Sequence, residues 1–147
     1  MLTLKSMGDL KSTTALISGW NVIETINNSG ADILVELAFT DLKTGEPALS
    51  HVKQALHNGM HVSMTNKGPV ALHFPELHKL ALSKNVQIGI EGTVMSGTPS
   101  INLGKEMLLA AGITKIQGIL NGTTNYILGE MSSGIGYDVA LKQAQEL

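Results

Sequence analysis

Three short apolar runs, each preceded by a segment with helical apolar spacing, constrain the fold of this chain more than any other feature. The runs cover residues 31–37, 60–64 and 86–90. Nearly continuous apolar runs of this length are typical of strands in a parallel sheet that is covered on both faces. Parallel strands need crossover connections of a dozen or more residues, usually through a helix, and the intervening segments are long enough for this. Residues 20–90 therefore predict an open parallel α/β sheet.

Helices are predicted where apolar residues recur at helical spacing. The first is expected to end at Gly30 and the second at Gly59, since glycine is common just beyond a helix. The third is expected to begin at Pro75, because proline is favoured in the first turn. In the first helix the spacing is seen at Val22, Ile23 and Ile26. In the second and third helices, the positions predicted to be buried are Leu49, Val52 and Leu56, and Leu77, Leu80 and Ala81.

The pattern changes after the third run. Glycine, serine and proline cluster over residues 94–99, where we place a domain boundary that divides the chain into residues 1–96 and 97–147. Residues 1–19 show little periodicity and are read as a loop. The elements expected beyond the boundary are a helix over 99–112, a strand over 113–120, and helices over 123–131 and 138–147.

Composition excludes several classes of function. The formal net charge is −2 and there is no basic stripe, which argues against nucleic acid or an anionic membrane as the main partner. No apolar run approaches the roughly 20 residues of a membrane span. Cysteine is absent, so there are no disulfides and no thiolate metal site. The five histidines show no metal-ligand spacing and are read as surface or partly buried side chains.

The segments that follow the three predicted strands are polar or contain glycine. They are residues 38–41, 65–69 and 91–94. In an open parallel sheet, ligands bind at the carboxyl ends of the strands. Loops are polar in most proteins, so one such segment means little, but three at one edge favour a ligand site.

Two charged residues at these exits can carry chemistry. Lys67 can pair with a phosphate or carboxylate, or transfer a proton; the alternative is a solvated loop lysine. Glu91 can contribute to a site for a hard cation; the alternative is an acid that caps a helix or is otherwise hydrogen-bonded.

Residues 121–125 form a turn of small polar residues that leads into a predicted helix. Such a turn presents free backbone N–H groups to an anion or carboxylate. The alternative is ordinary N-capping by Thr123 or Thr124, and both can hold at once.

The stretch over residues 121–128, NGTTNYIL, is close to the signature of the homoserine dehydrogenase family, which the chain resembles. TNKGPVA at 65–71 and EGTVMSGTP at 91–99 agree with that family in order and spacing, and TGEP at 44–47 resembles its microbial, especially archaeal, branch. The family interconverts L-aspartate 4-semialdehyde and L-homoserine with NAD or NADP, on the route to threonine, methionine and isoleucine. The resemblance implies a cytoplasmic oxidoreductase with a small-molecule substrate, and a homodimer.

In fold terms, the resemblance implies an α/β protein. Residues 1–96 correspond to the later part of a Rossmann-like dinucleotide-binding domain. Residues 97–147 correspond to the beginning of an α+β catalytic and dimerisation domain.

Site roles are implied at the positions that match the family. Lys67 corresponds to the lysine at the junction of cofactor and substrate, where it takes part in catalysis and in cofactor binding. Ala38 and Thr40 lie in the loop that touches the cofactor ribose, and the family often has threonine where this chain has Ala38. Gly122 and Thr123 belong to the substrate pocket. The segment that binds a monovalent cation, usually sodium, largely through backbone oxygens contains Glu91, Val94, Ser96 and Thr98.

Compared with the family, we expect the chain to begin after the glycine-rich turn that binds pyrophosphate. We also expect it to stop before the acid that binds substrate and the lysine held to move the proton. On this expectation the 147 residues alone bind NAD(P) weakly and oxidise no homoserine, since hydride transfer needs both partners held in place. The alternative is a non-catalytic α/β module for binding or dimerisation. The flanking gene sequence distinguishes the two readings, and the choice between NAD and NADP is not assigned.

Overall fold

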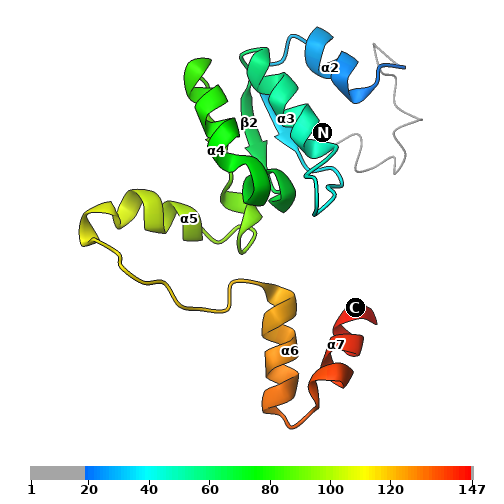
Figure 1. Ribbon diagram of the computed structural model, residues 1–147, viewed down its shortest axis with the longest axis vertical. Helices are drawn as coiled ribbons and strands as arrows, with labels where there is room; N and C mark the ends of the chain where they lie inside the picture. The colour runs from blue at the N-terminus through cyan, green and yellow to red at the C-terminus, as the bar shows by residue number, and fades with distance from the viewer. Residues whose placement is uncertain (1–18, 147) are drawn as a thin grey trace, which may run out of the picture.

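The computed structural model describes residues 19–146, and its first half is built on a parallel sheet (Figure 1). The strands are β1 (Ile33–Glu36), β2 (His61–Met64) and β3 (Ile88–Gly89), hydrogen-bonded in the order β1-β2-β3. This confirms the predicted parallel α/β arrangement. The loop predicted for residues 1–19 falls almost wholly outside the described residues.

Helices alternate with these strands along the chain: α2 (Val22–Asn28), α3 (Ala48–His57) and α4 (Lys67–Ser83). Helix α3 packs on β1 and β2 and also against α2 and α4, so that α3 and α4 lie side by side in front of the strands (Figure 1). Right-handed crossovers between successive neighbouring strands place their helices on the same face of a sheet, which fits this arrangement. The core between these layers is made by Ile26, Leu49, Val52, Ala55, Leu56, Met60, Val62, Met64, Leu77, Ala81 and Val86.

The prediction that the strands are covered on both faces is wrong for the described part of the chain. In β1, Glu36 is buried, whereas Ile33 and Val35 are 58% and 59% exposed. β2 alternates in the same way, with Val62 and Met64 buried between exposed neighbours. Within residues 19–146, Ile33 and Val35 remain exposed on this face, so an apolar run shows that a strand can be buried and not that both of its faces are.

Helix α4 begins at Lys67, eight residues before the predicted start, and Pro75 lies inside it. The prediction chose the wrong proline, because Pro69 already occupies the first turn, where a missing N–H costs little. Pro75 cannot donate to the carbonyl oxygen four residues earlier, yet the helix continues. As predicted, Leu77 and Ala81 are buried in its second half.

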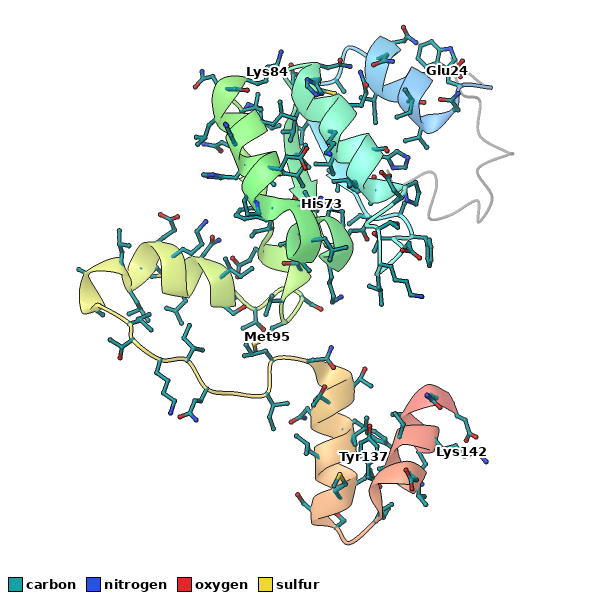
Figure 2. The ribbon with its side chains drawn as sticks, in the orientation of Figure 1. Glu24, His73, Lys84, Met95, Tyr137 and Lys142 are labelled. Atoms are coloured by element: carbon teal, nitrogen blue, oxygen red, sulfur yellow. The ribbon has the colours of Figure 1, made fainter. Side chains whose placement is uncertain are left out.

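The second half of the chain is helical and open. A short helical segment comprises α5 (Ser100–Asn102), a wider π-type turn η3 (Leu103–Met107) and a 3-10 turn η4 (Leu109–Ala111). It ends at Gly112, whose φ of 61° lies in the left-handed region that favours glycine. The hairpin of α6 (Gly122–Ser132) and α7 (Tyr137–Glu146) follows, with Tyr137 between the two helices (Figure 2).

The strand predicted for residues 113–120 is not formed. This stretch makes no ladder pairing within residues 19–146, and Ile113, Ile116 and Ile119 are all exposed. Apolar alternation marks a stretch that is able to pair, but a strand also needs a partner edge to bond with.

Among residues 19–146, no helix combines the length and the apolar character that a membrane span requires.

Candidate functional site

The carboxyl ends of the three parallel strands meet at one edge of the sheet, as the sequence predicts. The segment after β2 runs directly into α4, and the segment after β3 forms the 3-10 turn η2 (Glu91–Thr93). The turn that follows contains Met95 and Ser96 in the left-handed region, with φ of 57° and 53°. Met95 lies where this turn approaches the start of α6 (Figure 2).

Lys67 is the first residue of α4 rather than a loop residue. Its side chain is exposed, and no ion pair joins its ammonium group to any acid among residues 19–146. Asn66, the N-cap residue before it, makes no side-chain cap bond, and its amide nitrogen donates to the Glu36 carboxylate at 3.2 Å. A lysine that opens a helix at a strand exit is well placed to meet an anionic group, which the helix N-terminus also attracts.

Lys67 borders two open hollows. One, of about 600 Å³, is shared with Thr65, Glu91 and Ser96. The other, of about 480 Å³, is shared with Val94, Asn121 and other residues from the 118–128 stretch. Lys67 therefore borders one hollow at the strand exits and another at the start of the second half of the chain.

A third hollow, of about 440 Å³, brings Ser96 and Thr98 together with Gly122 at the start of α6. The side chain of Asn121 caps this helix, accepting hydrogen bonds from the Thr124 backbone N–H at 2.9 Å and from the Thr124 hydroxyl at 3.1 Å. Capping by Thr123 or Thr124 was therefore the wrong alternative, and the cap lies just before them. Thr123 is exposed and lines none of these three hollows.

The loop after β1 is closed by its own hydrogen bonds. Thr40 donates from its hydroxyl to the Gly45 carbonyl at 3.0 Å, so this hydroxyl is engaged within the loop, and Ala38 is exposed. The pKa of Asp41 is held below its ordinary value, first by the backbone N–H of Thr44, then by the Thr44 hydroxyl and the Lys43 N–H. Neither Ala38 nor Thr40 borders the hollows at Lys67, and the loop reaches α4 through the packing of Gly45 on Gly68.

Glu91 caps the next helical segment. Its two carboxylate oxygens accept from the backbone N–H groups of Ile101 and Asn102, at 2.9 and 2.8 Å. Of the two readings of this residue, the cap is the one observed, and a role of Glu91 in cation binding stays a prediction. No group of three or more His, Cys, Asp or Glu side chains is placed to hold a metal ion within the described residues.

Glu91→Gln is expected to lower the free energy of unfolding by about 1 kcal/mol, because the amide loses one of two acceptors at a helix start. Urea unfolding in sodium and in potassium buffers of equal ionic strength measures this. The matched control is Glu106→Gln, an exposed acid of the same segment, which should change stability little. A loss confined to the sodium buffer would contradict the capping role and assign the carboxylate to the cation.

Sequence reasoning missed a buried polar cluster beneath this edge. Glu36 is 3% exposed, and its carboxylate lies 2.8 Å from Nδ1 of His51, which is 8% exposed. The prediction that all five histidines are surface or partly buried side chains is wrong for His51, which is buried. The signal was present, since His51 stands three residues after Ala48 and four before Ala55, both fully buried.

Comparison with known proteins gives the family. The model of the homoserine dehydrogenase family matches residues 99–147. The NAD(+)-dependent homoserine dehydrogenase of Pseudomonas canavaninivorans is 51% identical over 122 residues, which are 83% of this chain and 35% of that protein. The homoserine dehydrogenase of Sulfurisphaera tokodaii is 47% identical over 125 residues, 85% of this chain and 41% of that protein.

A solved structure agrees. A hyperthermophilic archaeal homoserine dehydrogenase in complex with NADPH superposes with a TM-score of 0.80 at 32% identity, over 99% of this chain and 44% of the other. The chain thus spans less than half the length of each of these relatives. Their similarity extends across the parallel sheet, the exits around Lys67 and the hairpin after residue 121, and on these grounds the chain belongs to the homoserine dehydrogenase family.

Proposed function

We propose that this chain carries the junction of cofactor and substrate in an NAD(P)-dependent homoserine dehydrogenase, which interconverts L-homoserine and L-aspartate 4-semialdehyde. The observation that supports this most is the position of Lys67. Lys67 is the first residue of α4 and borders the hollows shared with Glu91 and with Asn121. A cation that borders two hollows can contact two ligands, and holding both ligands at reacting distance is the main requirement for hydride transfer.

The residues present fit the two ligands. The ammonium group of Lys67 complements the carboxylate of an amino-acid substrate or a phosphate of the cofactor. The first N–H groups of α6, at Gly122 and Thr123, lack helical partners and can bind a substrate carboxylate or carbonyl oxygen. The loop at Ala38 and Thr40, packed on the start of α4, is the segment that we assign to the cofactor ribose. The chemistry supplied by bound NAD or NADP is hydride transfer at the nicotinamide.

A monovalent cation, usually sodium in this family, is part of the proposal. The turn after β3 offers backbone carbonyl oxygens together with hydroxyl oxygens, which suit a hard cation. Because the Glu91 carboxylate caps α5, we assign the cation to backbone oxygens of Glu91, Val94, Ser96 and Thr98, with the Ser96 and Thr98 hydroxyls nearby. The left-handed backbone at Ser96 turns this segment sharply, as a loop that wraps an ion requires.

We further propose that residues 1–96 belong to the dinucleotide-binding domain and residues 97–147 to the catalytic and dimerisation domain. The sheet ends at Gly89 and the helical hairpin follows residue 121, which supports this division. We propose that the natural protein is a homodimer. Large apolar side chains that are strongly exposed in the second part, among them Met107, Leu109 and Ile116, are consistent with such an interface.

The test is an assay of the natural protein that contains this chain, with L-homoserine and either NAD or NADP in excess. We expect reduced cofactor to form with L-homoserine and not with L-serine, which is shorter by one methylene and cannot place its hydroxyl at the same point. If the natural protein reduces neither cofactor with homoserine, the proposed function is wrong and the non-catalytic reading is favoured.

A further inference from the structure

Glu36, the last residue of β1, is a buried carboxylate with a complete set of hydrogen-bond partners. One oxygen accepts from the Ala38 backbone N–H at 2.7 Å and from the Asn66 amide at 3.2 Å. The other lies 2.8 Å from Nδ1 of His51. Removing a carboxylate from water is strongly unfavourable unless such partners replace its hydration, so Glu36 depends on these hydrogen bonds to remain buried.

The three partners belong to three different segments. Ala38 begins the loop after β1, His51 lies in α3, and Asn66 is the N-cap residue of α4. Asparagine at an N-cap normally accepts a bond from the second or third helical N–H. Here that bond is absent and the amide points to Glu36 instead, so the orientation of the residue before Lys67 is set by the buried carboxylate.

We infer that Glu36 is a positioning residue, which holds the loop at Ala38 and the first turn of α4 in fixed relation to each other. Through Asn66 it sets the direction in which Lys67 leaves the sheet edge, and through the Ala38 N–H it sets the start of the loop assigned to the cofactor. It touches neither ligand, because its side chain is enclosed by its three partners. The effect of Glu36 on catalysis that we predict rests on the proposed function, whereas its predicted effect on the structure does not.

A residue that only filled the core would behave differently. Glu36→Ala should loosen the two segments that it joins, so the Ala38 amide should exchange with deuterium about tenfold faster or more. Glu36→Gln should restore most of the protection, because an amide can accept from Ala38 and Asn66 and donate to a neutral His51 ring. Asn66→Ala removes only the bond to α4, and should speed exchange at the amides of Lys67, Gly68 and Val70 while leaving Ala38 protected.

The matched control is Leu56→Ala. Leu56 is fully buried near the other end of α3, at the far edge of the sheet from the cluster. This variant should lose stability through a cavity, without selective exchange at Ala38. In the natural protein, Glu36→Ala and Asn66→Ala should raise KM for the cofactor, Glu36→Gln should recover it, and Leu56→Ala should leave it unchanged.

The hydrogen-exchange and kinetic measurements allow the positioning role of Glu36 and the proposed function to fail separately. Hydrogen exchange needs no ligand, so unchanged protection of Ala38 in Glu36→Ala overturns the positioning role whatever the activity. A KM that rises equally in Leu56→Ala also overturns it, since the effect would then follow from stability alone. A wild-type protein that forms no reduced cofactor from homoserine overturns the proposed function. Even then, faster exchange at Ala38 in the Glu36→Ala variant than in the wild type would support the role of Glu36 in the fold.

Discussion

In the natural protein, Lys67→Met is expected to lower kcat/KM for homoserine by about a hundredfold or more, since methionine keeps the apolar stem and removes the charge. Lys67 has no acid partner among residues 19–146, so its ammonium group is available for a ligand. Because the side chain is exposed, the substitution should change the free energy of unfolding little. Steady-state kinetics and urea unfolding on the same preparations measure both effects.

The matched control is Lys84→Met. Lys84 is exposed at the C-cap of the same helix, at the end away from the strand exits (Figure 2). It changes the net charge by the same amount, so any general electrostatic effect on an anionic cofactor should appear in both variants. A kcat/KM that is unchanged in Lys67→Met, or equally reduced in Lys84→Met, would contradict the role of Lys67.

Gly68→Ala should destabilise the protein by about 1–3 kcal/mol, as overpacking in an interior does. A Cβ atom at Gly68 would lie 2.7 Å from the Thr40 hydroxyl oxygen and 3.1 Å from both the Asp41 carbonyl oxygen and Gly45 Cα. Two of these three neighbours are backbone atoms, so the loop itself must move away from α4. Cofactor affinity should therefore fall together with stability.

The matched control is Gly129→Ala, which lies inside α6 with nothing within 4 Å of a Cβ atom. Alanine favours a helix by about 1 kcal/mol over glycine, so this change should stabilise or be neutral. Opposite signs for the same substitution in two helices would show that contact with the 40–45 loop decides the outcome. Equal stabilisation in both variants would show that this contact is not formed.

The sheet could be predicted from the sequence because its signals are local. The three apolar runs and the helical spacing at Leu49, Val52 and Leu56 identify strands and helices wherever these pack. Three motifs, at 65–71, 91–99 and 121–128, indicate the family, and Lys67 is singled out by the residues around it. The hollows that Lys67 borders confirm that the strand exits come together.

The predictions that were wrong share one cause: the sequence of a segment does not say which other segment it will pack against or pair with. The stretch 113–120 alternates like a strand but has no edge to pair with in the described chain, and β1 is apolar at its first three residues but is covered on one face only. Glu36 and His51 stand 15 residues apart in sequence and meet only when α3 packs on β1. Glu91 likewise caps a helical segment through the backbone N–H of Ile101, ten residues later in the sequence.

The most direct test of the site is a crystal structure of the natural protein with NADPH and homoserine bound. The account predicts that the nicotinamide ring and the substrate lie in the hollows that border Lys67, with the substrate toward Asn121 and Gly122 at the start of α6. A nicotinamide ring bound away from all three strand exits would contradict it.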